Sequence, residues 1–184
     1  NVRVPFRPVI AAAEADYEMI ETQLIAPPRR QPPRRYSFEQ IVENDEVREA
    51  MPGIDIDTLH FDFGSAQIRP EEVRRLDRVG EALEKVVAAH PNEVFMIEGH
   101  TDAVGSDAAN LALSRQRAQA VKSALTENFL IEPDNLRIVG PRERYLKIPT
   151  QEPEVENRRV TVRRLTPLLS GGMEEGRSPG IRTA

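Results

Sequence analysis

The stretch Gly99-His100-Thr101-Asp102-Ala103-Val104-Gly105 follows a short apolar run, residues 94–97, with only Glu98 between them, and precedes a long helical pattern, residues 108–128. The apolar run is typical of a buried strand, and the apolar residues after the stretch recur at three- and four-residue steps, which predicts a helix. Open α/β sheets place their ligands at the carboxyl ends of the strands. This loop is therefore both the centre of the predicted fold and a candidate site.

Strand and helix patterns continue on both sides of this unit. Residues 54–63 alternate like a strand with one buried face, and Pro70 opens a helical pattern that runs to about residue 89. Residues 136–139 and 159–165 give two further strands. This βαβαβ-loop-β order predicts a two-layer α/β sandwich with a mixed four-stranded sheet. The two crossovers require some parallel pairing.

The chain ends differ in composition from this central part. Residues 27–35 consist of paired prolines and arginines around one glutamine, which predicts an extended spacer that is either simply solvated or binds an anionic polymer or lipid surface. Apolar spacing predicts an amphipathic helix over 10–24, and Ser37 with Gln40 predicts a capped helix over 37–50. We expect three parts: an N-terminal extension with short helices and a Pro/Arg-rich linker (1–53), a domain (54–166) and a disordered tail (167–184).

Charge and composition exclude several classes of function. The 184 residues carry a net charge of −5, which argues against nucleic acid as a partner because such binding needs a broad basic surface. The absence of cysteine excludes disulfides, thiolate nucleophiles and Cys-ligated metals. No apolar run is long enough for a transmembrane segment in this chain. The sequence opens at Asn1, so a targeting segment or anchor can lie outside it.

The helix after the loop carries polar groups on one side. Asn110 and Arg117 are seven residues apart, which is two helical turns, and Asp102 can approach them from the loop. One interpretation is an Asp102–Arg117 ion pair that pins the loop to the helix. The other is a ligand that carries an amine and an acid on one carbon, because a carboxylate accepts from an ammonium and a guanidinium donates two bonds to a carboxylate. The sequence leaves both open.

Other chemistry is disfavoured. His60, His100 and Asp102 do not complete a metal-ligand set. Ser114 with His100 and Asp102 does not form a hydrolase triad, since Ser114 lies within a helix and no strand-to-helix nucleophile elbow precedes it. We therefore expect no catalytic residue, no enzyme activity, no metal and no cofactor.

Four motifs carry a resemblance to a known family: Phe61-Asp62-Phe63, the stretch from Gly99 to Gly105, Asn110-x-x-Leu113-Ser114-x-x-Arg117-Ala118 and Asn157-Arg158-Arg159-Val160. In this order and spacing they resemble the OmpA-like domain, which occurs in outer-membrane protein A, peptidoglycan-associated lipoprotein and the flagellar stator protein MotB. The resemblance covers about residues 54–166. The loop after the third strand departs from it, since Pro141 follows Gly140 where the family has a Gly-x-Gly turn.

The resemblance implies non-covalent binding of peptidoglycan and a location in the periplasm or cell envelope, with outer-membrane association left open. It implies that Asp102 and Arg117 hold the head group of meso-diaminopimelate and that Asn110 and Arg158 line the site. We include Thr101, from the same motif as Asp102, in this ligand-binding set. The alternative function is a scaffold for protein–protein interaction in the envelope. In either case we expect residues 1–53 to be a tether outside the domain that can dock an envelope protein.

Overall fold

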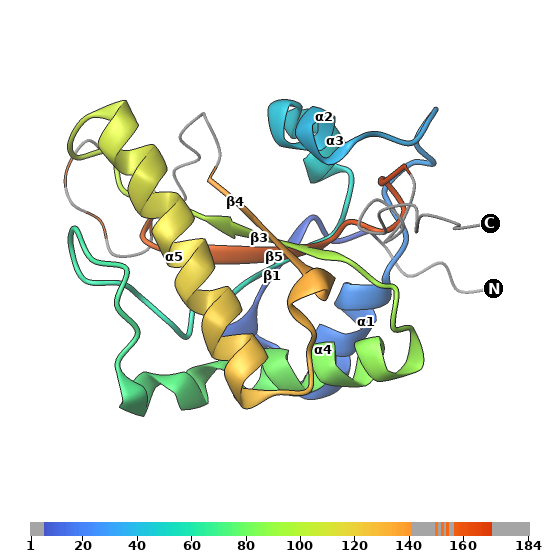
Figure 1. Ribbon diagram of the computed structural model, residues 1–184, viewed down its shortest axis with the longest axis horizontal. Helices are drawn as coiled ribbons and strands as arrows, with labels where there is room; N and C mark the ends of the chain where they lie inside the picture. The colour runs from blue at the N-terminus through green and yellow to red at the C-terminus, as the bar shows by residue number, and fades with distance from the viewer. Residues whose placement is uncertain (1–5, 141–149, 151, 153, 155–156, 171–184) are drawn as a thin grey trace, which may run out of the picture.

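A five-stranded mixed sheet forms the centre of the molecule (Figure 1). The computed structural model describes residues 6–140, 150, 152, 154 and 157–170. Strand order is β1-β2-β5-β3-β4, with β1 parallel to β2, β3 parallel to β4, and β5 antiparallel to both of its neighbours. The strands are β1 (Val9–Ala11), β2 (Gly53–Asp55), β3 (Phe95–Gly99), β4 (Leu136–Val139) and β5 (Val160–Arg164).

Three helices pack on one face of this sheet and bury the main core. They are α1 (Tyr17–Ile25), α4 (Asp77–Ala89) and α5 (Asp107–Asn128). Ala118, Val121 and Leu125 are fully buried on the sheet side of α5, as the helical spacing predicts. The predicted α/β sandwich is confirmed, and so is its parallel pairing.

Gly99, at the end of β3, brings α5 unusually close to the sheet. A Cβ atom at this position would lie 1.8 Å from the carbonyl oxygen of Ser114, so only glycine fits beneath the helix. Ser106 caps the N-terminus of α5 by accepting a hydrogen bond from the Ala109 N–H. This close contact places the first half of α5 directly over the loop that follows β3.

The first predicted strand is much shorter than the alternation suggested. Strand β2 ends at Asp55, although Ile56, Leu59 and Phe61 beyond it are buried. The Leu59 N–H donates to the Ile56 carbonyl, so the chain turns there and fills the core without extending the sheet. The alternation of apolar residues therefore indicated buried positions and not a continuous strand. The helical pattern that follows divides into a 3₁₀ helix, η2 (Pro70–Leu76), and α4.

The segment predicted as a helix over 10–24 contains a strand and two helices. Val9 and Ile10, both β-branched, belong to β1, which pairs with β2 and adds the fifth strand to the predicted four. A 3₁₀ helix, η1 (Ala12–Glu14), follows. Helix α1 begins only after Asp16, whose carboxylate accepts from the Met19 N–H at 2.8 Å. This cap sets the start of the helix, which the apolar spacing had placed too early.

A second pair of helices lies on the opposite side of the sheet from α1 and α4 (Figure 1). The predicted helix over 37–50 splits at Asn44 into α2 (Phe38–Glu43) and α3 (Asp45–Glu49), because the Asn44 side chain accepts from the Val47 N–H and starts a new helix. The predicted capping box of Ser37 and Gln40 is present. Ile41 packs here in a smaller apolar cluster with Met51, Met96 and Leu165.

The N-terminal extension packs on the domain, which differs from the tether expected for residues 1–53. Ile20 and Leu24 of α1 belong to the main core, and the Gln23 side chain donates to the Gly53 carbonyl at 3.1 Å. At the other end, Leu168 and Leu169 are buried in the smaller cluster, and residues 171–184 of the predicted tail lie outside the described part. Where an independently folding and binding unit begins stays a prediction.

Candidate ligand-binding site

Two loops meet beneath α5, one after β2 (residues 56–69) and one after β3 (residues 100–106). Arg117 of α5 joins them. Its Nε donates to the Ser65 carbonyl at 2.8 Å, its Nη1 to the His100 carbonyl at 2.9 Å and its Nη2 to the Asp62 carbonyl at 3.3 Å. The guanidinium also lies over the Phe61 ring, 5.2 Å from its centroid. Arg117 therefore holds both loops against the helix.

Arg117 is completely buried, which is rare for a charged side chain. Burial and the positive charge of Arg158 together lower its pKa to about 10, although the carboxylate of Asp102 acts in the opposite direction. At neutral pH the side chain stays protonated. It is thus a fixed positive charge whose hydrogen bonds reach the backbone of both loops.

The carboxylate of Asp102 pairs with Arg158, at 3.0 Å between Oδ2 and Nη1. The same guanidinium donates through Nε to the Phe61 carbonyl at 2.7 Å, and Asp102 Oδ1 accepts from the Val104 N–H at 3.3 Å. The two side chains are only 5% and 12% exposed. An Asp102–Arg117 ion pair was one of the two interpretations left open by the sequence, but Arg117 lies deeper, with its nitrogens directed at backbone carbonyls.

The remaining two candidates line the same loop. Asn110, in the first turn of α5, is 8% exposed, and its Nδ2 has no hydrogen-bond partner among the residues that the structure describes. Its Oδ1 lies against Gly105, where an added Cβ would be 3.8 Å away. Thr101 is buried next to Asp102. The structure thus places Thr101 and Asp102 in the loop after β3, Asn110 against the same loop at Gly105, and the Arg158 guanidinium on Asp102.

Backbone groups complete the site, and the sequence analysis did not assign them. The Ser65 N–H donates to the Asp62 carbonyl at 3.0 Å and closes a turn in which Gly64 has φ +68°. Both ends of this turn accept hydrogen bonds from Arg117. The motif Phe61-Asp62-Phe63 marked the segment, but a carbonyl that binds an arginine leaves no side-chain signal in a sequence.

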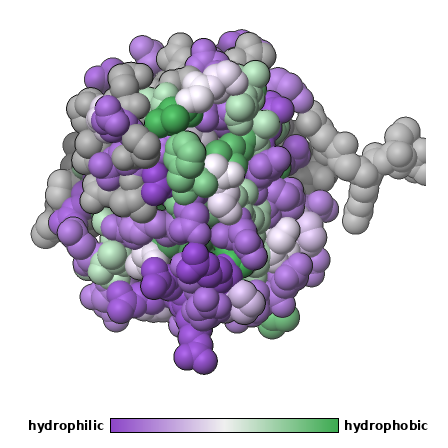
Figure 2. Space-filling model, turned by 90° about the vertical axis from the view of Figure 1, so that its left-hand side faces the viewer, coloured by the Kyte–Doolittle hydropathy of each residue, from purple (hydrophilic) through white to green (hydrophobic). Residues whose placement is uncertain are grey.

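Figure 2 faces this end of the molecule, where mostly polar side chains surround a central strip of less polar ones. Within the described ranges, no group of His, Cys, Asp and Glu side chains is arranged to hold a metal ion. Nor does any helix of that part have the length and apolar character needed to cross a membrane. The predicted departure from the family at Pro141 lies outside the described residues.

The fold and the site define a small α/β module with a buried cluster of opposite charges in the loops at one end of its sheet. The chain belongs to the OmpA family, whose model matches residues 60–159.

The chain is similar to several known proteins. It is 33% identical over 111 residues to the peptidoglycan-associated lipoprotein of Pseudomonas putida, covering 59% of this chain and 63% of the lipoprotein. It is 30% identical over 104 residues to outer membrane porin F of Pseudomonas aeruginosa, covering 55% of this chain and 29% of the porin. The chain therefore spans less than two thirds of either relative.

Among solved structures, the peptidoglycan-associated lipoprotein from Burkholderia pseudomallei is 24% identical, with a TM-score of 0.47, and the match covers 58% of this chain and 87% of that one.

Proposed function

We propose that this chain binds peptidoglycan non-covalently and serves as an anchoring module in the cell envelope. Family membership supports this function, and so do relatives that are named as peptidoglycan-associated lipoproteins. The observation that carries it is the buried Asp102–Arg158 pair with the unpartnered amide nitrogen of Asn110 nearby in the same loop region. A buried donor without an acceptor is costly unless a ligand supplies one.

The residue recognised is, in this proposal, meso-diaminopimelate of the peptide stem. Its zwitterionic head group carries an ammonium that Asp102 accepts from, and a carboxylate that binds the Arg158 guanidinium and the Asn110 amide. Without ligand, the two charges neutralise each other at 3.0 Å. When the zwitterion enters, each charge exchanges one partner for another, so no charge is left buried and unpaired.

Arg117 supports this site from behind. Its three hydrogen bonds go to backbone carbonyls, so its main role is to hold both loops and to keep a positive charge close to Asp102. Replacing Arg117 therefore disturbs the arrangement of the loops as well as the local potential.

Sedimentation with purified peptidoglycan tests the function. Asp102→Ala and Arg158→Ala should each lose binding, because removing one partner of a desolvated charge pair typically costs on the order of 2–5 kcal/mol. The matched controls are Asp134→Ala and Arg74→Ala, which remove exposed charges outside the two loops and should sediment like wild type.

Melting curves establish that each variant is folded. A folded Asp102→Ala protein that still sediments like wild type would contradict the site. A wild-type protein that stays in the supernatant would contradict the function itself and favour the scaffold alternative.

A further inference from the structure

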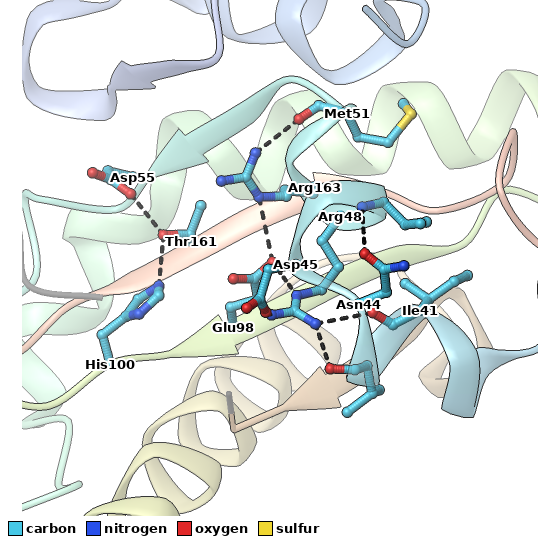
Figure 3. Close-up of polar contacts among 12 residues, drawn as sticks. Ile41, Asn44, Asp45, Arg48, Met51, Asp55, Glu98, His100, Thr161 and Arg163 are labelled. Carbon is cyan, nitrogen blue, oxygen red and sulfur yellow. Dashed lines mark hydrogen bonds and ion pairs between the residues drawn. The ribbon is translucent and has the colours of Figure 1, made fainter. Parts of the chain in front are cut away.

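A chain of buried hydrogen bonds runs along the opposite face of the sheet, and it ends on the residue that begins the binding loop. His100 Nε2 lies 3.0 Å from Thr161 Oγ1 of β5, and Thr161 Oγ1 lies 2.6 Å from Asp55 Oδ1 of β2 (Figure 3). All three residues are at least nine-tenths buried. Arg159 Nε is 3.4 Å from the other Asp55 oxygen, which keeps this carboxylate next to a positive charge.

The direction of these bonds fixes the state of the imidazole. A carboxylate can only accept, so the single hydroxyl proton of Thr161 goes to Asp55. Thr161 Oγ1 must then accept from His100, and Nε2 is the protonated ring nitrogen. Burial lowers the pKa of His100 well below its usual value, and the positive charges of Arg159, Arg163 and Arg48 lower it further. The ring is therefore neutral, with its proton on Nε2.

Charged groups face this ring from every element packed around it. They are Arg48 of α3, Asp55 of β2, Glu98 of β3, Arg163 of β5 and Arg159, which directly precedes β5. With Thr161 they line a cavity of about 260 Å³ beside the imidazole. The hydrogen bond to Thr161 is the contact that orients the ring toward β5.

The backbone of His100 acts on the ligand site. Its N–H donates to the Arg159 carbonyl at 2.8 Å, continuing the pairing of β3 with β5, and its carbonyl accepts from Arg117 at 2.9 Å. Two residues later, Asp102 pairs with Arg158. His100 therefore has its side chain bound to Thr161 on one face of the sheet, whereas its carbonyl accepts from Arg117 on the other face.

We propose that the hydrogen-bond chain His100–Thr161–Asp55 positions the binding loop, and that His100 is a positioning residue for the ligand site. By fixing the imidazole, Thr161 fixes the direction of the His100 carbonyl toward Arg117 and the placement of Asp102. His100 itself touches no ligand in this role. The inference rests on the proposed function, since it assigns a role to residues that support binding at Asp102 and Arg158.

Two variants of Thr161 test the proposal. Thr161→Val keeps the shape and removes the hydroxyl, whereas Thr161→Ser keeps the hydroxyl. The matched control is Thr126→Val, which removes a hydroxyl that bonds only within α5. Nitrogen-15 NMR of the imidazoles reads the tautomer, and the sequence has only three histidines to assign. Sedimentation with peptidoglycan reads the affinity.

We expect the Nε2–H tautomer in wild type, Thr161→Ser and Thr126→Val, with wild-type affinity in both variants. Thr161→Val should lose the tautomer preference and bind about tenfold more weakly, the effect of one lost hydrogen bond. If Thr161→Val does not fold, His100→Phe removes the same bond from its other end and should show the same loss of affinity.

Wild-type affinity in folded Thr161→Val, or in His100→Phe, would overturn the positioning role. An Nδ1–H tautomer of His100 in the wild type would contradict the proposed direction of the hydrogen bonds from His100 to Thr161 and from Thr161 to Asp55. The NMR measurement contains no peptidoglycan, so it distinguishes these failures from a failure of the proposed function, which would show as no sedimentation of the wild type.

Discussion

Arg117 combines complete burial with a full charge, and its replacement tests whether it is structural as well as functional. Arg117→Ala removes three hydrogen bonds to carbonyls of two loops and leaves a cavity under α5. We expect a loss on the order of 3–5 kcal/mol in the free energy of unfolding, similar to Leu125→Ala in the core. Arg117→Lys should recover part of it, since an ammonium reaches fewer of the carbonyls.

Urea denaturation measures these losses. An Arg117→Ala protein as stable as wild type would mean that the carbonyls find other donors and that Arg117 acts on the ligand alone.

At the scale of single residues, the sequence predicted which candidate residues lie near one another but not which of them pair. Spacing predicted that Asp102, in the loop after β3, faces Asn110 and Arg117 of the following helix, and the structure has Asp102 in that loop and the other two on α5. It left open an Asp102–Arg117 pair, whereas the carboxylate contacts Arg158. Which arginine pairs with Asp102 depends on how deeply each guanidinium is buried. The close approach of α5 over Gly99 sets the depth of Arg117. Periodicity does not encode this depth.

At the scale of elements, Glu93 connects the start of β3 to the end of β5. Its carboxylate accepts two bonds from Arg164, at 2.9 and 2.6 Å, and one from Thr166. Burial raises its pKa, but these hydrogen bonds and the charge of Arg164 outweigh that effect, so the pKa lies below 4.5. The ionised form therefore stabilises the fold, and this stability is present above about pH 4.5 and lost as the pH falls through the lowered pKa.

Glu93→Gln should consequently lower the melting temperature at pH 7, with a cost of about 1–2 kcal/mol. The difference from wild type should shrink below pH 4.5, as the wild-type carboxyl is protonated. Glu81→Gln, at an exposed position on α4, is the control and should match wild type throughout. A difference that is constant between pH 3 and pH 7 would show that the charge of Glu93 is not the source of the stability.

The same scale shows why some elements were predictable. Helix α5 and strands β4 and β5 have apolar residues whose spacing matches one regular structure, and their bounds agree with prediction within a residue or two. Asn44 and Asp16 instead set helix limits through local side-chain caps. Caps of this kind and apolar spacing can predict different helix bounds, and a single sequence does not show which of the two determines the start of the helix.

At the scale of the whole molecule, the N-terminal segment is part of one core. Ile20 of α1 is completely buried against residues of α4 and the sheet. Ile20→Ala should therefore destabilise the entire protein by roughly 2–5 kcal/mol, within a single unfolding transition. Met19→Ala, at a 39% exposed neighbour, should have little effect.

Calorimetry of the Ile20→Ala variant distinguishes an N-terminal segment that belongs to the core from one that is only a tether. If Ile20→Ala leaves the main transition unchanged, the extension is independent of the domain. The sequence predicted the tether because prolines separate α1 from the rest of the chain, and it could not show that β1 pairs with β2 across that gap.

The central claim is that the loops at the end of β3 recognise the zwitterionic head group of meso-diaminopimelate. Titration calorimetry with a stem tripeptide that ends in meso-diaminopimelate, compared with one that ends in lysine, tests it most directly, because lysine lacks the second carboxylate. We predict that the diaminopimelate peptide binds at least about tenfold more tightly, since a charged hydrogen-bonded contact is worth about 1.5 kcal/mol or more, and that Asp102→Ala abolishes this binding. Equal affinity for the two peptides, or binding that survives in Asp102→Ala, would contradict the account.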